Sequence, residues 1–253
     1  MSLNSRHDLI KSLQTTLPRG MPFDLDTLQR HGVSPQLAAK YVNSGWLVRL
    51  GQGIYAFAGD SLELHPTLCF LQNRVSGLHV AGKSALAMQG VRHNLMYREK
   101  TILWGDTRFS PPEWLTTRFP THYVSANLFH WPDSSPLPEK TLTTPPGVTA
   151  GLHVSVPERA LLEMLYEVGT HQGVEEAYNL FAGVRNLRLN TLGPLLEACT
   201  SIKTTRLLLT WGRETGTINV EQLQQQYHLP TGSNKRWIRP LDDGSLLSLK
   251  PHG

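Results

Sequence analysis

The sequence predicts an α+β protein in which an N-terminal winged helix-turn-helix domain precedes a larger, mixed α+β domain. Three observations support this prediction. Residues 34–43 have the pattern of an amphipathic helix, two short β-like runs follow that helix around a tight turn, and 253 residues are too many for a winged helix alone. We expect a first domain at residues 1–58, a linker at 59–66 and a second domain at 67–253.

The helix at residues 34–43 is predicted from its start signal and its two faces. Ser34 can cap the first turn, and Pro35 has the φ angle that suits the first helical position. At about 100° per residue, one side of the helix is apolar and the opposite side is polar. The apolar side comprises Leu37, Ala38, Tyr41 and Val42. The polar side comprises Gln36, Lys40 and Asn43, which could reach base edges in a major groove.

The segment after this helix predicts a wing. Gly45 is a suitable left-handed helix cap, and residues 46–50 and 54–57 read as strands on either side of a Gly51–Gly53 turn. Arg49 and Gln52 would then approach phosphates. The candidate DNA-binding residues are Ser34, Gln36, Lys40, Asn43, Arg49 and Gln52. Winged helices also serve as protein-docking modules, and this alternative stays open.

Two further helices are predicted upstream. Asp24 is placed to cap a helix that ends near Gly32, and an apolar stripe predicts an earlier helix from about Ser5 to Leu17. Three helices and a hairpin complete a small domain. That segment also carries most of the positive charge: residues 1–57 hold six basic and three acidic side chains, whereas the rest of the chain has a net charge of only +1. The excess suits binding to DNA phosphates.

Other features narrow the class of protein. Cys69 and Cys199 stand in no metal-binding or redox spacing, which favours a reducing cytoplasm. We find neither a signal-peptide pattern nor an apolar run long enough to span a membrane. No arrangement of nucleophile, base or metal ligands stands out, and scattered histidines such as His122 are typical of surface or packing positions. We therefore expect no catalytic residues, no metal, no cofactor and no membrane partner.

The second domain is predicted to mix strands and helices. Short helices are expected at residues 67–75 and 84–89, and strands at 78–81, 101–104, 122–125 and 128–131. From Ser155 the chain turns helical, with Ser155 and Glu158 forming a capping box. Arg159 and Glu163, four residues apart, are expected to form an ion pair. Later helices are expected at residues 173–181, 191–199, 201–211 and 219–227, and short strands in the last 25 residues.

One helical segment carries a second cluster of positive charge. Residues 183–213 have five basic side chains and only one acidic one. The five are Arg185, Arg188, Lys203, Arg206 and Arg213. Such a cluster is usually a solvated face, but it could also bind nucleic acid, and we favour additional operator phosphates over an RNA.

Residues Gly77–Ser84 match the phosphate-binding pattern G-x-x-x-x-G-K-[ST]. A working P-loop follows a buried apolar strand and opens a substantial helix, and neither is predicted here. Ser84 is more simply a helix cap. A nucleotide-handling enzyme that carries a winged helix therefore stays as the alternative function.

Three segments resemble those of the AbiEi-type antitoxins of abortive-infection, or type IV toxin–antitoxin, systems. Ser44–Tyr55 resembles the family's wing, Lys83–Val91 its SAL…GL helix, and Val156–Glu163 its PERALLD helix start, with Glu163 in place of the usual Asp. The matches occur in the family's order over residues 5–215. The resemblance implies a winged helix that binds double-stranded operator DNA and represses its own promoter. It also implies a C-terminal domain that counteracts a nucleotidyltransferase-like toxin without requiring a stable complex.

Overall fold

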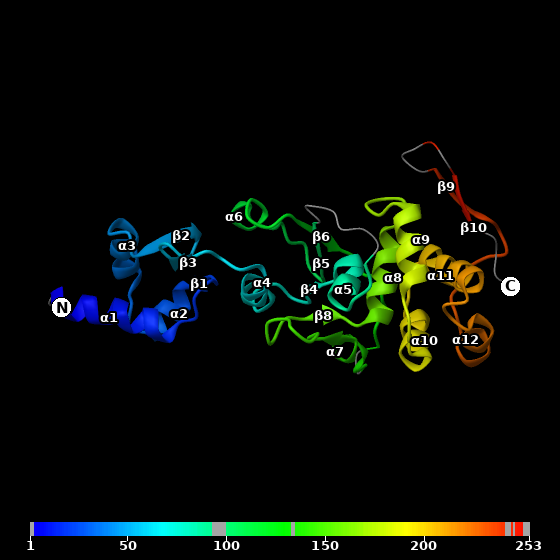
Figure 1. The fold of residues 1–253 in the computed structure, drawn as a ribbon, viewed down its shortest axis with the longest axis horizontal. Coiled ribbons are helices and arrows are strands. Elements are labelled where there is room, and N and C mark those ends of the chain that lie inside the picture. The colour runs from blue at the N-terminus through cyan, green and yellow to red at the C-terminus, as the bar shows by residue number, and fades with distance from the viewer. Residues whose placement is uncertain (1–2, 93–99, 133–134, 241–243, 245, 250–253) are drawn as a thin grey trace.

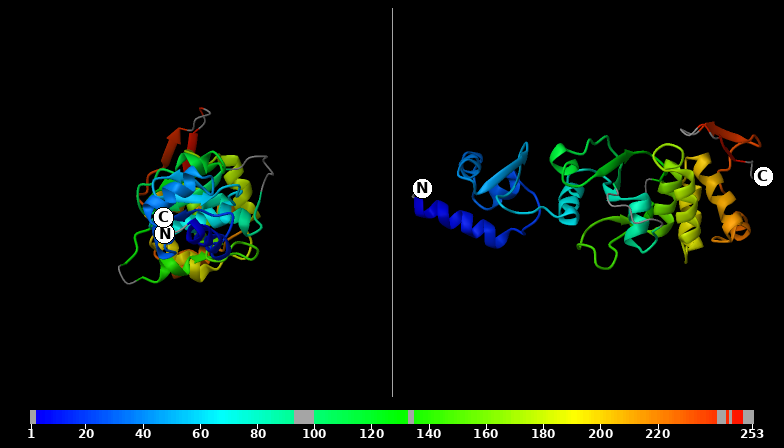
Figure 2. Two further views of the ribbon diagram at one scale, coloured as in Figure 1. Left: turned by 90° about the vertical axis from the view of Figure 1, so that its left-hand side faces the viewer. Right: turned by 45° about the horizontal axis from the view of Figure 1, so that its top comes forward.

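The computed structural model describes residues 3–92, 100–132, 135–240, 244 and 246–249. The molecule is elongated (Figure 1). The helix α1 (Leu3–Thr16) lies at one end of its long axis, and the hairpin of β9 (Trp237–Pro240) and β10 (Leu246–Leu249) lies near the other. A smaller N-terminal domain and a larger C-terminal domain follow one another along this axis (Figure 2). The predicted α+β class is confirmed.

The N-terminal domain is a winged helix, as predicted. After α1 come β1 (Phe23–Asp24), α2 (Leu25–Arg30), α3 (Pro35–Asn43), β2 (Leu47–Gly51) and β3 (Ile54–Phe57). The strands form an antiparallel sheet in the order β1-β3-β2. The two-residue β1 was not predicted, because its pairing partner β3 lies about thirty residues further along the chain.

A hydrophobic core joins the helices of this domain to its sheet. Its buried members include Ile10, Leu13, Leu28, Leu37, Tyr41, Leu47 and Phe57. A separate, larger cluster extends from Leu68 to Leu249 and forms the core of the C-terminal domain. The buried members of the first cluster end at Phe57, and those of the second begin at Leu68.

The linker is anchored at both ends. The Asp60 carboxylate accepts hydrogen bonds from the Arg19 guanidinium and from the Gly20 amide. The helix α4 (Leu64–Gln72) begins inside the segment predicted as linker, because the Glu63 amide is held by the Gly20 carbonyl at 2.7 Å and Leu64 packs on the C-terminal core. Across the junction, Arg74 Nη1 lies 2.8 Å from Asp24 Oδ2. The domains therefore touch through specific contacts and are not merely tethered.

The C-terminal domain is built on a five-stranded mixed sheet in the order β6-β5-β4-β8-β7. The strands are β4 (His79–Val80), β5 (Thr101–Gly105), β6 (Thr121–Ser125), β7 (Leu142–Thr143) and β8 (Val154–Ser155). Pairs β5–β6 and β4–β8 are parallel, and the other two pairs are antiparallel. Three short helices connect the strands: α5 (Gly82–Met88), α6 (Glu113–Thr116) and α7 (Leu137–Lys140).

The helix α8 (Pro157–Glu167) is the centre of the helical half. It packs against α5 on one side and against later helices on the other (Figure 1). Those helices are α9 (Val174–Gly183), α10 (Leu189–Glu197) and α11 (Ile202–Thr215). The last helix, α12 (Val220–Gln226), packs on α10 and α11, and all four helices lie close to the predicted ranges. Because α8 is covered on both sides, even its charged residues Glu158, Arg159 and Glu163 are buried. Buried charged groups require hydrogen-bonding or ionic partners. The partners of these residues connect α8 to the neighbouring elements.

Three local predictions for this domain were wrong. Ser155 and Glu158 form no capping box, because α8 begins after Val156 and both side chains have other partners. Residues 128–131 form only an isolated bridge between Phe129 and Cys199. Ser84 is not a helix cap, since α5 begins at Gly82 and the Ser84 hydroxyl instead accepts the Ile102 amide proton at 2.9 Å.

Candidate nucleic-acid interface and the polar centre of the C-terminal domain

The helix α3 presents the predicted polar face to solvent. Ser34 Oγ accepts the Leu37 amide proton at 3.2 Å, and the positive φ of Gly45 ends the helix so that Trp46 N donates to Tyr41 O. These two signals fix where the helix begins and ends. Leu37, Ala38 and Tyr41 are then buried in the domain core. The exposed side chains are those predicted to read bases: Gln36, Lys40 and Asn43.

The wing places its two predicted residues in solvent beside α3. The register of β2 and β3 shifts between Arg49 and Gly51, and this irregularity lets Arg49 Nε donate to the Gly51 carbonyl at 3.2 Å. Arg49 and Gln52 are exposed. A side chain at Gly51 would contact the Trp114 indole of α6, so the base of the turn lies beside the C-terminal domain.

The predicted basic face of residues 183–213 does not exist as one solvated surface. Arg206 is 2 % exposed, and its guanidinium donates to the carbonyls of Thr231, Ser233 and Lys235. Lys203 is also buried, and its ammonium donates to the carbonyls of Tyr166 and Val168. The expectation was wrong because these two cations hold backbone carbonyls in the interior. Substituting Arg206 by Glu would therefore damage the fold rather than test binding to nucleic acid.

The other three basic residues lie at the surface but are not unpartnered. Arg188 forms a two-point ion pair with the buried Glu158 at 2.9 Å, which lowers the pKa of that carboxyl although burial alone would raise it. Arg185 donates to the Ala182 and Val184 carbonyls, and Arg213 contacts Glu221 at 3.5 Å. Arg188 therefore stabilises the start of α8.

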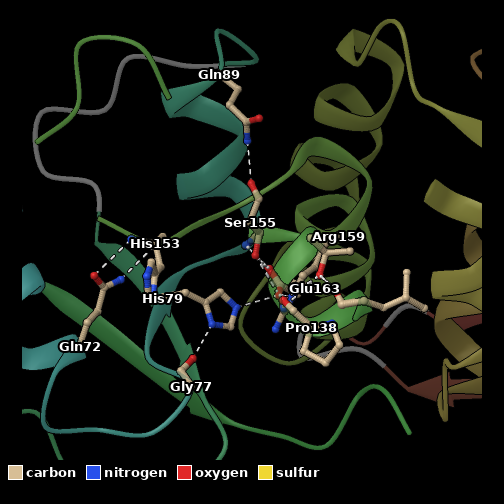
Figure 3. A network of polar contacts seen from close by, with 12 residues as sticks. Gln72, Gly77, His79, Gln89, Pro138, His153, Ser155, Arg159 and Glu163 are labelled. Carbon is tan, nitrogen blue, oxygen red and sulfur yellow. Dashed lines mark hydrogen bonds and ion pairs between the residues drawn. The ribbon is translucent and has the colours of Figure 1, made fainter. Parts of the chain in front are cut away.

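The buried carboxylate of Glu163 forms the polar centre of the C-terminal domain (Figure 3). His79 Nε2 lies 2.9 Å from Oε1, Arg159 Nε donates to Oε1 at 2.8 Å, and Ser155 Oγ lies 2.8 Å from Oε2. The Gly82 amide adds a bond to Oε2 at 3.1 Å. The predicted pair of Arg159 with Glu163 is confirmed. One carboxylate thus ties β4, α5 and β8 to α8.

The contacts of His79 indicate its protonation. Nδ1 lies 2.6 Å from the Gly77 carbonyl, which can only accept, so this nitrogen carries a proton. Nε2 faces Glu163 Oε1 at 2.9 Å. Burial raises the pKa of Glu163, but the positive charge and hydrogen bond of His79, with Arg159 and Ser155, hold it below its usual range. His79, Arg159 and Ser155 therefore hold Glu163 in its ionised form in the interior.

The same contacts exclude a working P-loop at Gly77–Ser84. The Gly82 amide, at the start of α5 where a phosphate would sit, already donates to Glu163. Lys83 Nζ pairs with Glu176 at 2.9 Å. The strand β4 lies inside the motif rather than before it, and α5 has only seven residues. Protein carboxylates thus hold the groups that would bind a phosphate.

We expect Lys83→Ala to change neither DNA binding nor nucleotide affinity, because Lys83 forms a partly exposed ion pair with Glu176 and has no phosphate to hold. Isothermal titration of the full chain with ATP and Mg²⁺ should show no saturable heat before or after the substitution. Micromolar nucleotide binding that disappears in Lys83→Ala would restore the enzyme alternative.

Comparison with known families identifies the architecture. A model described as "Transcriptional regulator, AbiEi antitoxin N-terminal domain" matches residues 6–97, and a second, described as "Transcriptional regulator, AbiEi antitoxin, Type IV TA system", matches residues 98–249. The chain belongs to the AbiEi antitoxin family. The boundary between the two family models lies after residue 97, whereas the boundary between the two hydrophobic cores lies near residue 60. The N-terminal family model therefore includes α4, β4 and α5, which belong to the larger core.

A solved structure supports the fold of this AbiEi protein. The chain is similar to the crystal structure of the RV2827C protein from Mycobacterium tuberculosis, with a TM-score of 0.56 and 18 % identity over 95 % of this chain and 90 % of the other. At this identity the likeness shows a shared fold only. No protein with a curated description matches the chain. None of the described helices combines the length and apolar character that crossing a bilayer requires.

Two of the segments that resemble the family meet in the structure. Lys83–Val91 covers most of α5, and Val156–Glu163 opens α8, and these helices pack on each other. Their junction is the Glu163 carboxylate, which binds the first amide of α5. The substitution of Glu for the family's usual Asp is accommodated there, since both carboxylate oxygens have donors.

Proposed function

We propose that this AbiEi protein is a cytoplasmic DNA-binding autorepressor and antitoxin without enzymatic activity. In this proposal α3 and the wing bind double-stranded operator DNA in the chain's own upstream region. The larger domain counteracts a nucleotidyltransferase-like toxin, and a stable complex with that toxin is not required. The observation that carries the DNA-binding part is the exposed polar face of α3, formed by Gln36, Lys40 and Asn43, directly beside an exposed wing.

The side chains on this face suit direct readout of bases. Gln36 and Asn43 can each pair with adenine through two hydrogen bonds, and Lys40 can reach guanine or a phosphate. Ser34 caps the helix N-terminus, where backbone amides and the helix dipole favour a phosphate. The net positive charge of the N-terminal domain adds attraction that does not depend on sequence. A domain that only docks another protein would not need base-reading side chains, a phosphate-binding helix end and a net positive charge together.

The antitoxin part of the proposal rests on membership of the AbiEi family. The C-terminal domain has its own hydrophobic core and a buried polar centre, so it can act as a unit distinct from the winged helix.

A gel shift with DNA from the chain's own upstream region tests the proposal. We expect saturable binding that survives excess competitor DNA of unrelated sequence and that weakens as salt increases. Equal competition by unrelated DNA would contradict specific operator recognition.

We expect Arg49→Ala in the wing to weaken binding to all DNA sequences alike, because Arg49 is placed to contact phosphates rather than bases. The slope of log affinity against log salt should fall by about one unit. Titrations at several salt concentrations on operator and unrelated DNA measure both effects. A loss confined to the operator would instead assign Arg49 to base reading.

A further inference from the structure

Three side chains from separate parts of the chain meet at the end of α8. His122 lies on β6, Glu167 is the last residue of α8, and His171 lies in the turn that follows. One ligand atom from each lies within 4.8 Å of the other two. His122 Nε2 is 3.4 Å from Glu167 Oε2, and the two imidazole rings are 4.6 Å apart between centroids. His122 was expected to be an isolated surface or packing histidine, but in the structure it lies beside Glu167 and His171.

The distance between His122 Nε2 and Glu167 Oε2 is long for a hydrogen bond and matches that between two ligands of one metal ion. A distance of 3.4 Å is longer than the usual range of about 2.7–3.2 Å for hydrogen bonds to nitrogen. Two ligands bound tetrahedrally to one ion at about 2.1 Å are separated by roughly 3.4 Å. The backbone supports the cluster, because the amides of Thr170, His171 and Gln172 all donate to the Glu167 carbonyl. This turn brings Glu167 and His171 to the same side.

There is room beside the three side chains. On one side they line a small space of about 20 Å³ together with Gly82 and Met164, which is enough for one water-sized group. They also line a larger cavity of about 500 Å³ that extends toward Lys203 and Arg239. An ion held by three protein ligands would therefore have an open coordination position facing a cavity, as in metal sites that bind a water or a small ligand.

We propose that His122, Glu167 and His171 bind a divalent transition-metal ion such as Zn²⁺. Two imidazoles and one carboxylate are typical ligands for Zn²⁺ and related ions, whereas Mg²⁺ and Ca²⁺ require mostly oxygen ligands. Lys203 and Arg239 line the same cavity and oppose a further positive charge, and Glu167 offsets them in part. The affinity should therefore be well below that of a closed four-ligand structural zinc site.

The test is a titration of the purified, metal-free full chain with Zn²⁺, followed by Co²⁺ as a visible-absorption probe. We expect one Zn²⁺ per chain and saturable Co²⁺ absorption. His171→Ala is the principal variant, because His171 is exposed and its loss should leave the fold unchanged. We expect it to weaken Zn²⁺ binding at least about tenfold, as losses of outer-shell partners alone already do. His122→Ala should do the same.

The matched control is His130→Ala, which removes another exposed histidine from a loop outside the cluster. It should bind Zn²⁺ as tightly as the unaltered chain, and circular dichroism should give the same spectrum for all variants. The proposal is overturned if the unaltered chain takes up no saturable Zn²⁺, if His171→Ala binds as tightly as the unaltered chain, or if His130→Ala loses binding equally.

Discussion

Replacing Gln36, Lys40 and Asn43 together with alanine should abolish specific operator binding while the protein remains folded. The three side chains are exposed on α3 and make no contribution to the core beneath, which is formed by Leu37, Ala38 and Tyr41. Loss of a bidentate base contact costs about 1–3 kcal/mol. Losing Gln36 and Asn43 should together weaken specific binding between about 30-fold and 10⁴-fold, since each 1.4 kcal/mol is tenfold. Titration of labelled operator DNA measures this loss.

A matched control removes exposed amides from the opposite end of the molecule. Gln222, Gln225 and Gln226 lie on α12 and are exposed, and their replacement by alanine should leave operator affinity within about twofold, the scale of context-dependent surface effects. If the α3 variant binds the operator as tightly as this control, α3 is not the DNA-reading helix.

Glu163→Gln should be the most destabilising single substitution of the polar centre. The change keeps the shape of the side chain but removes the negative charge that faces His79 and Arg159, both of which are buried. Removing one partner of a buried ion pair costs about 3–5 kcal/mol, because the remaining charge is left uncompensated. Urea unfolding of the full chain, followed by circular dichroism, gives the change in unfolding free energy.

Glu176→Gln provides the control for Glu163→Gln. Glu176 forms an ion pair with Lys83 at 2.9 Å, but its side chain is 31 % exposed, so the loss should be about 1 kcal/mol or less. Equal destabilisation by the two substitutions would show that the burial of Glu163 does not determine the loss of unfolding free energy.

The contribution of Glu163 should also depend on pH in a defined direction. Its pKa in the folded protein is below the value of about 4.3 typical of an unfolded chain, because the favourable contacts with His79, Arg159 and Ser155 outweigh burial. The stabilisation is therefore fully present above that unfolded value and is lost as the pH falls through the lower folded one. The stability difference between the unaltered chain and Glu163→Gln should narrow in acid. A stability difference that stays constant from pH 7 to pH 3 would contradict the lowered pKa of Glu163 in the folded protein.

The winged helix could be predicted because its determinants are local in sequence. Ser34 and Gly45 define the ends of α3, and the alternation of apolar and polar residues between them defines its faces. The wing follows directly, with its turn set by glycines. These signals act within a few residues of one another, so the single sequence contains what is needed to place the exposed face.

The polar centre could be predicted only in part. The Arg159–Glu163 pair is visible as a four-residue spacing within one helix. Ser155 was assigned to a local cap because it precedes a helix, but its hydroxyl bonds Glu163 instead. His79 reaches Glu163 from 84 residues away through the pairing of β4 with β8. Capping rules consider only neighbouring residues, so they could not predict that Ser155 bonds the Glu163 carboxylate instead of capping the helix.

Burial explains the error at the basic segment 183–213. The charges of Lys203 and Arg206 can be counted from the sequence. The sequence does not show that both side chains point into the interior and donate to backbone carbonyls of other segments. For the proposed metal site, the only local signal is the four-residue spacing of Glu167 and His171 at a helix end. His122 joins them through the parallel pairing of β5 and β6, which no local pattern indicates.

The most direct test of the account measures repression and toxin protection in the same cells. A reporter driven by the chain's own upstream region records repression, and survival during co-expression of the proposed nucleotidyltransferase-like toxin partner records protection. The account predicts that the Gln36, Lys40 and Asn43 triple alanine variant loses repression but still protects, because only the exposed face of α3 is altered. Full repression by this variant would contradict DNA reading by α3, and loss of protection at unchanged protein level would contradict the proposed separation between the two domains.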